Sequence, residues 1–237
     1  MPPGEADGFY RGPSVRRIRA VHRRLRRQQG PFKPKPRIPV IDELVSTVLS
    51  QHTSDINTAR AFAGLKARFP TWEEVRDALS EEIADAIRAG GLADQKAPRI
   101  KAILTEIEER EGRLDLSRLE SLTDQDVDDY LCSLPGVGPK TAACVLVFSM
   151  GRNAFPIDTH VHRVARRLGW IDEGVTAEAA SRKLAPRVPA ELRYSLHMAL
   201  IDHGRQVCKA RNPACTQCVL FDLCEGGQRL LAAGDAI

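Results

Sequence analysis

The sequence predicts an all-α protein. Apolar residues recur with a period near 3.6 along almost every segment, and no segment shows the sustained alternation that is typical of a strand. The segment 141–150 (TAACVLVFSM) carries no charge, which indicates a helix that is buried on all sides. With 237 residues and a hydrophobic fraction of 43%, the chain is long enough for one large or two modest folded domains.

The expected helices follow one another along the chain. A capping box of Thr71 and Glu74 begins one helix, and Gly90-Gly91 ends it. Thr123 is the expected N-cap of the helix that ends near Leu134. The apolar faces that define the helices are, in chain order, Val15, Ile18, Val21 and Leu25; Ile41, Leu44, Val45, Val48 and Leu49; Val75, Leu79, Ile83 and Ile87; Ile100, Ile103, Leu104 and Ile107; Val127, Tyr130, Leu131 and Leu134; Val161, Val164 and Leu168; and Leu192, Leu196 and Leu200.

Positive charge is concentrated in the first of these helices. The net charge is +4 and the pI about 8.8, and eleven Lys and Arg residues lie between Arg11 and Arg37 without any Asp or Glu. This basic amphipathic helix could contact phosphates, lie on a membrane surface or simply be a solvated face. The Pro-rich residues 32–39 are interpreted as a linker.

Neither a membrane span nor a signal peptide is expected. No apolar run approaches the ~20 residues that cross a bilayer, and the start Met1–Glu5 has no apolar signal core. We therefore expect a cytoplasmic protein whose six cysteines are reduced.

The run LPGVGPKT contains a candidate phosphate-binding turn. Gly136 and Gly138 allow positive φ and close approach of a ligand, and Pro139 suits the first position of a new helix. The N–H groups at such a turn bind phosphate, because the dipole of the following helix favours an anion there. A tight helix–helix connection is the alternative interpretation.

Lys140 lies in the first turn of that helix. The positive end of the helix dipole disfavours an ammonium at this position, and a neutral amine is a nucleophile for carbonyl-like carbon centres. A lysine that only pairs with a phosphate is the alternative.

Four cysteines, Cys208, Cys215, Cys218 and Cys224, have the spacing C-x6-C-x2-C-x5-C. In a reducing compartment this density predicts metal ligation, and both zinc and a [4Fe–4S] cluster accept four cysteines. Zinc ribbons usually have two short Cys-x-x-Cys pairs, whereas this loop has one. Cys132 and Cys144 are interpreted as ordinary core residues.

These motifs together resemble one family. LPGVGPKTA is followed eighteen residues after Lys140 by Asp158 in PIDTHVHRV, and this combination is similar to the helix-hairpin-helix and Gly-Pro-Asp region of the endonuclease III family of DNA glycosylases. The cysteine spacing matches the iron–sulfur loop of that family, which implies a [4Fe–4S] cluster. The resemblance further implies that Lys140 attacks C1′ of a damaged nucleotide and expels the base through a Schiff base. Asp158 would assist, and β-elimination would then cut the strand.

The resemblance also implies the architecture and the substrate. It predicts a two-domain helix-hairpin-helix fold with a helical barrel at residues 36–152, a discontinuous cluster domain at 1–35 and 153–237, and a DNA cleft between them. The expected activity is that of a bifunctional glycosylase and abasic-site lyase of base excision repair, which removes oxidised pyrimidines. The expected partner is double-stranded DNA with damaged bases or abasic sites, bound by a monomer in the cytoplasm with the chromosomal DNA.

Several DNA-contacting residues follow from the same resemblance. The residues that fill the gap left by the extruded base match two loops, 49–55 and 91–94. Relatives carry a glutamine one position later than Gln51, so either Gln51 or His52 is the wedge. Cys132 stands where some relatives have an acidic residue. The remaining candidates are the apolar plug Leu92, the pocket-region residues Ser50 and Asp55, and the phosphate contacts Arg205, Lys209 and Arg211.

Three alternatives accompany this interpretation. His160 and His162 could be a metal pair, but residues two apart on a helix point in different directions, so a structural or phosphate-contacting role is favoured. An adenine glycosylase acting at mismatches is a second alternative, although such relatives usually lack the lysine. A catalytically weak DNA-binding relative is the third.

Overall fold

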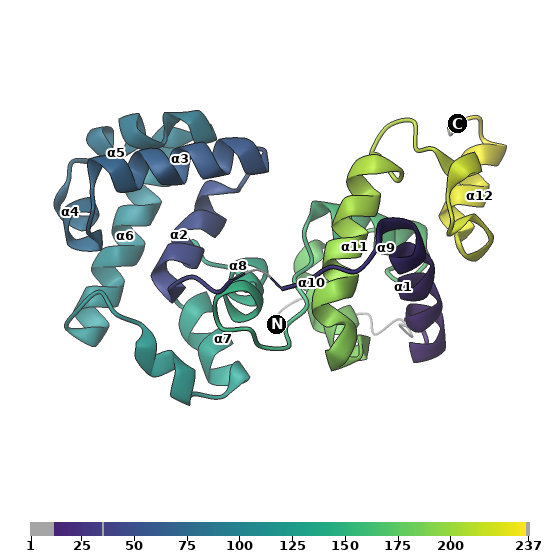
Figure 1. The fold of residues 1–237 in the computed structure, drawn as a ribbon, viewed down its shortest axis with the longest axis horizontal. Helices are drawn as coiled ribbons and strands as arrows, with labels where there is room; N and C mark the ends of the chain where they lie inside the picture. The colour runs from purple at the N-terminus through teal and green to yellow at the C-terminus, as the bar shows by residue number, and fades with distance from the viewer. Residues whose placement is uncertain (1–11, 35, 236–237) are drawn as a thin grey trace, which may run out of the picture. The chain divides into compact units, whose positions relative to one another are not determined.

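The computed structural model of the protein describes residues 12–34 and 36–235 (Figure 1). The start Met1–Glu5 and two residues of the basic segment, Arg11 and Lys35, lie outside the described residues. Every regular element in these ranges is a helix, and they contain no strand. The prediction of an all-α protein is therefore confirmed.

The chain forms two compact units. One unit consists of Lys35–Arg152, and the other combines Met1–Pro34 with Asn153–Ile237. In the described ranges no helix is both long enough and apolar enough to cross a membrane.

The continuous unit contains the hairpin and both loops that were expected to contact the DNA stack. Its helices are α2 (Val40–Leu49), α3 (Asp55–Arg68), α4 (Trp72–Asp77), α5 (Ser80–Ile87), η1 (Arg88–Gly90), α6 (Ala93–Glu111), η2 (Ser117–Ser121), α7 (Asp124–Cys132), α8 (Pro139–Cys144) and the π-helical turn η3 (Val145–Ser149).

Local signals place these helices. The Thr71–Glu74 capping box and the Thr123 N-cap both form as predicted. The single helix expected from Val75 to Ile87 is wrong, however, because α4 ends at Asp77 and α5 begins at Ser80. Leu79 is the N-cap of α5 and is 65% exposed, so it does not belong to the apolar face. The buried apolar residues of α5 stand at positions that fit the same period as those of α4. The period alone therefore did not reveal the break between the two helices.

Buried apolar side chains hold the hairpin in place. Along the uncharged segment, Ala142, Val145 and Leu146 are at most 4% exposed, which confirms a buried helix. The segment is α-helical to Cys144 and then π-helical over η3. Each fully buried aliphatic side chain contributes about 1.5–3 kcal/mol, and α8 packs against both α2 and α7. The buried residues that follow the start of α8 therefore hold that start in place.

The discontinuous unit is built around the N-terminal basic helix. Its helices are α1 (Val15–Gln29), α9 (Thr159–Arg167), α10 (Ala177–Leu184), η4 (Ala185–Arg187), η5 (Ala190–Leu192), α11 (Arg193–Gln206), η6 (Cys215–Gln217), η7 (Phe221–Leu223) and α12 (Glu225–Ala232). The apolar stripe of α1, with Ile18, Val21 and Leu25 fully buried, packs into one core with Phe155 and Trp170. Residues from the two ends of the chain thus share one apolar core.

Candidate functional site

The LPGVGPKT run forms a tight connection between α7 and α8. Val137 donates its N–H to the carbonyl of Leu134 at 3.1 Å, which closes the turn. Gly136 has φ +69°, a conformation that favours glycine. A Cβ at Gly136 would also lie 2.8 Å from Nε of Arg99. Gly136 is therefore required by the turn itself.

Gly138 has a different environment. It is the N-cap of α8 with φ −110°, which other residues adopt easily, and a Cβ there would meet no atom within 4 Å. Neither backbone strain nor crowding within the described residues requires glycine at this position. The open space beside Gly138 lies at a helix N-terminus, where a phosphate can approach.

Lys140 follows Pro139, which occupies the first helical position as predicted. The Lys140 side chain is half-buried and makes no hydrogen bond or ion pair with any other described residue. The adjacent Thr141 is 4% exposed and belongs to the buried face of α8. The backbone of Lys140 is consequently fixed, whereas its amine is available to a ligand.

Asp158 is placed by α9 in the discontinuous unit. It is the N-cap of this helix, and its Oδ1 accepts a hydrogen bond from the backbone N–H of Val161 at 2.7 Å. One carboxylate oxygen is thus used for capping, and the second is available for other contacts. Lys140 and Asp158 belong to different units.

His160 and His162 have separate partners. Nδ1 of His160 lies 3.0 Å from Nη2 of Arg163, whereas Nε2 of His162 lies 2.8 Å from the carbonyl oxygen of Val175. Burial lowers the pKa of His160, and the charge of Asp158 opposes this shift. The two rings therefore have structural contacts, in agreement with the preferred interpretation.

The four clustered cysteines line one cavity in the discontinuous unit. Cys208, Cys215 and Cys224 are each at most 9% exposed. Burial raises the pKa of the Cys218 thiol to about 11, and it also raises the pKa of Cys215 and Cys224. Thiolates in this cavity therefore need a cationic partner such as a metal centre.

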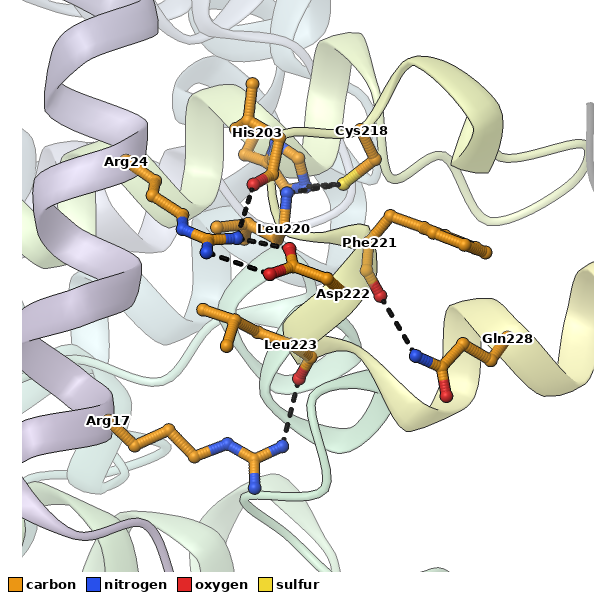
Figure 2. Close-up of polar contacts among 10 residues, drawn as sticks. Arg17, Arg24, His203, Cys218, Leu220, Phe221, Asp222, Leu223 and Gln228 are labelled. Atoms are coloured by element: carbon orange, nitrogen blue, oxygen red, sulfur yellow. Dashed lines mark hydrogen bonds and ion pairs between the residues drawn. The ribbon is translucent and has the colours of Figure 1, made fainter.

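N–H groups surround the sulfur atoms. The backbone N–H groups of Leu220 and Gly227 lie 3.4 and 3.2 Å from Sγ of Cys218 and Cys224, respectively. Nε2 of His203 lies 3.6 Å from Sγ of Cys218 (Figure 2). Donors of this kind stabilise the negative charge of metal-bound thiolates.

Arg167 of α9 also lies beside the sulfurs and holds the loop between the first two cysteines. Its Nη1 lies 3.3 Å from Sγ of Cys208 and donates to the carbonyl of Lys209 at 2.6 Å, while Nη2 donates to the carbonyl of Ala210 at 3.0 Å. Lys209 and Arg211 are both exposed on this loop. Arg205, at the end of α11, is exposed as well. The three predicted phosphate contacts are therefore accessible on the cysteine unit.

Helix α1 holds the other side of the cysteine loop (Figure 2). Arg24 forms an ion pair with Asp222 and donates to the carbonyl of Val219 at 3.1 Å. Arg17 donates to the carbonyl of Leu223 at 2.9 Å. At least these two arginines thus bind protein atoms, which the sequence did not indicate.

The two loops predicted to enter the DNA stack lie in the continuous unit. His52 and Leu92 have φ values of +56° and +51°, which are unusual for residues with side chains. His52 is exposed and Leu92 is 45% exposed. Gln51 is half-buried and its Oε1 accepts a hydrogen bond from Nη1 of Arg99 at 2.9 Å.

The two pocket-region candidates and Cys132 have ordinary local positions. The Ser50 hydroxyl donates to the carbonyl of Thr47 at 2.8 Å at the end of α2. Asp55 begins α3, and Cys132 is a half-buried residue at the end of α7.

Comparison with known families identifies the fold. The sequence model of the HhH-GPD superfamily of base excision DNA repair proteins matches residues 45–190, which include the hairpin, Lys140 and Asp158. The chain belongs to this superfamily. This match, together with the similarity to endonuclease III, shows that the protein is a DNA glycosylase of base excision repair.

Individual relatives agree with this membership. A putative DNA glycosylase of Arabidopsis thaliana is 44% identical over 166 residues, which are 70% of this chain and 57% of the relative. Endonuclease III of Thermotoga maritima is 37% identical over 182 residues, 77% of this chain and 81% of the relative. The solved structure of a trapped endonuclease III–DNA covalent intermediate matches with a TM-score of 0.79 and 27% identity. The match covers 92% of this chain and 99% of the endonuclease III chain.

The HhH-GPD protein has a [4Fe–4S] cofactor. The iron–sulfur binding domain of endonuclease III matches residues 208–224, which begin and end at a cysteine. In the described part of the chain, no three His, Cys, Asp or Glu side chains converge closely enough to hold a single metal ion. Four cysteine thiolates are a donor set that a [4Fe–4S] cluster accepts. The four thiols line one cavity here, so the residues present fit this cofactor.

Sequence reasoning missed several residues of this HhH-GPD fold. Arg24 was assigned to a solvent- or phosphate-facing surface, and Arg99 was not singled out. Lys96 was missed as well, although it is a lysine with only 3% exposure. Its position on α6, four residues before the buried Ile100, is the one signal that could have indicated burial.

Proposed function

We propose that this glycosylase is bifunctional and that Lys140 is its nucleophile. The observation that carries the proposal is the amine of Lys140, which has no partner among the described residues and stands at a helix start beside the open space at Gly138. A structural relative, endonuclease III, has been trapped as a covalent intermediate with DNA, which supports a covalent step. Oxidised pyrimidines in double-stranded DNA are the proposed substrates.

The chemistry begins with attack of the Lys140 amine on C1′ of the damaged nucleotide. The C1′–N bond breaks, and the base leaves with its bonding electrons. Asp158 stabilises the positive charge that develops on the sugar and accepts a proton from the attacking amine. The C1′–O4′ bond then breaks, O4′ takes up the proton held by Asp158, and a Schiff base forms between Nζ and C1′.

Strand cleavage follows from the same intermediate. Loss of a proton from C2′ forms a double bond and expels the 3′ phosphate, which is a β-elimination. Water then hydrolyses the Schiff base and restores the free amine. No redox step is involved.

Separate groups of residues position the DNA in this proposal. The N-terminus of α8 at Gly138 receives one phosphate, and Arg205, Lys209 and Arg211 contact others. The [4Fe–4S] cluster would be held by Cys208, Cys215, Cys218 and Cys224. Its contribution would be to order the loop that bears Lys209 and Arg211. Binding should weaken steeply with salt, because each phosphate contact releases counterions.

Borohydride trapping tests the proposal. The protein is incubated with duplexes that contain thymine glycol or an abasic site, and borohydride is then added to reduce any Schiff base. The wild type should form a covalent adduct, Lys140→Gln should form none, and Lys66→Gln, a lysine change on α3, should match the wild type. Absence of an adduct with wild-type protein would exclude the lyase assignment.

The same assay separates the alternatives. Release of adenine from a mismatch without an adduct would indicate a mismatch glycosylase. DNA binding without any base release would indicate a catalytically weak relative. We also propose that the protein acts as a monomer on chromosomal DNA in the cytoplasm, and light scattering with and without duplex tests the monomeric state.

A further inference from the structure

Lys96 is a buried cation at the start of α6. Its side chain is 3% exposed, and desolvation lowers its pKa. No carboxylate pairs with it among the described residues. Instead Nζ donates to the carbonyl of Leu49 at 2.7 Å and to the carbonyl of Gly90 at 2.8 Å. A buried ammonium is costly unless it is hydrogen-bonded, so these two bonds define its position.

The two carbonyls belong to the ends of two different helices. Leu49 is the last residue of α2, and Gly90 is the last residue of η1. A cation is favourable at the C-terminal end of a helix. One ammonium therefore joins the points at which the two DNA-facing loops begin.

Each loop places an exposed side chain shortly after its bonded carbonyl. His52 follows Leu49 by three residues, and Leu92 follows Gly90 by two. Both have positive φ, a strained conformation that persists only where the surrounding structure imposes it. Lys96 is the side chain that both loop starts share.

Arg99, one turn further along α6, makes Gln51 a weaker wedge candidate. Its Nη1 binds Oε1 of Gln51 at 2.9 Å, and the same side chain covers Gly136 of the hairpin. Gln51 is thus tied toward the protein, whereas the neighbouring His52 is exposed.

We propose that Lys96 is a positioning residue that fixes the separation of the two loops, so that His52 and Leu92 enter the DNA stack together as a pair of plugs. The inference rests on the proposed function, because it assumes that a damaged nucleotide leaves the duplex. Filling the gap is the step that Lys96 controls, and the covalent chemistry of Lys140 is separate from it.

Unstacking can be measured without chemistry. A duplex carries thymine glycol opposite 2-aminopurine, whose fluorescence rises when it is unstacked, and the protein carries Lys140→Gln so that no reaction follows. We expect the fluorescence rise at saturation to fall by about half or more in Lys96→Met, because a displacement of about 1 Å is sufficient to disturb such a site.

Lys101→Met is the matched control. Lys101 also lies on α6, and its Nζ donates at 2.6 Å to the carbonyl of Ala78, which stands between α4 and α5 and belongs to neither loop. The Lys101→Met substitution removes a similar bond from the same helix, so the fluorescence rise of this variant should equal that of the Lys140→Gln protein with native Lys96. An equal loss in Lys96→Met and Lys101→Met would mean that general loosening of the unit is responsible, and would overturn the proposal.

Activity with native Lys140 provides a second readout. In a duplex, Lys96→Met should lower kcat/KM for thymine glycol about tenfold or more. On the same lesion in a single-nucleotide bulge, which has no base pair to open and no opposite base to leave unpaired, it should change kcat/KM less than about twofold. Equal losses on both substrates would contradict a role in opening the duplex.

The plug assignment has its own test if Lys96→Met does not fold. His52→Ala and Leu92→Ala should each reduce the fluorescence rise, and Gln51→Ala should leave it unchanged. A loss confined to Gln51→Ala would overturn the assignment. Because these measurements use unreactive protein, they remain informative even if wild-type protein forms no borohydride adduct.

Discussion

The guanidinium of Arg24 binds both carboxylate oxygens of Asp222, with Nη2 2.8 Å from Oδ2. Asp222 lies between the third and fourth cysteines of the cluster loop. The pair is partly exposed, so its Coulomb attraction alone contributes little to stability. Arg24 also donates a hydrogen bond to the Val219 carbonyl, and this bond fixes the backbone of the loop. The N-terminal helix is therefore part of the structure that encloses the cluster.

We predict that Arg24→Met weakens cluster retention. The loop from Val219 to Asp222 loses its anchor, so its thiolates should release the cluster more readily. The visible absorbance of the cluster should decay faster than in wild type in the presence of an iron chelator. Arg23→Met is the control, because Arg23 is exposed on the same helix. Equal decay in the two variants would contradict the role of Arg24.

Asp158 should have two separable roles. Asp158→Asn should preserve thermal stability, because Asn caps helices as well as Asp, yet lower glycosylase activity about 10²–10⁴-fold. Asp158→Ala should lose the activity and also about 1 kcal/mol of unfolding free energy, because the hydrogen bond to Val161 disappears. Base-release kinetics and thermal unfolding measure the two effects. Full activity in Asp158→Asn would exclude its catalytic role.

The two hairpin glycines should respond differently to alanine. Gly136→Ala should lower the unfolding free energy by about 1 kcal/mol or more, because of its positive φ and its contact with Arg99. Gly138→Ala should change stability by less than about 1 kcal/mol, since its φ suits alanine. Its methyl group should nevertheless weaken DNA binding by occupying the space for a phosphate. Unaltered affinity in Gly138→Ala would contradict that phosphate contact.

Acid should destabilise the protein through His22. Burial, followed by the charges of Arg26 and Arg19, lowers the pKa of His22 from 6.5, and its Nε2 lies 2.9 Å from Oγ of Ser195. As the pH falls below 6.5, the unfolded chain takes up a proton that the folded protein resists. The stabilisation that neutral His22 provides is therefore fully present above pH 6.5. It is lost progressively as the pH falls from 6.5 toward the lower pKa of the folded state.

Thermal unfolding between about pH 7.5 and pH 5.5 tests this expectation, since an ordinary histidine titrates in that range. The melting temperature of His22→Gln should depend less steeply on pH than that of the wild type. Parallel curves for the two proteins would show that His22 does not contribute.

Sequence patterns were sufficient where a local signal determines structure. The Thr123 cap, Pro139 at a helix start and the uncharged segment 141–150 were all found in this way. Helix α3 was missed because its buried face, Thr58, Ala61 and Leu65, has only one large apolar residue. Its stripe does not stand out from the surrounding polar residues.

Long-range pairing could not be predicted. Arg24 finds its partners 195 and 198 residues away, and Lys96 binds a carbonyl 47 residues away. Backbone carbonyls have no sequence signature, since every residue has one. A buried cation held only by carbonyls therefore becomes recognisable once the fold is known.

The shared core of α1 and the C-terminal region has a consequence for synthesis on the ribosome. The continuous unit, Lys35–Arg152, is complete before the partners of α1 have been translated. Until residues beyond Asn153 emerge, Ile18, Val21 and Leu25 lack the core that buries them. Cluster insertion must await Cys224 as well, so the unit that contains α1 is completed after the continuous unit, although α1 is translated before it.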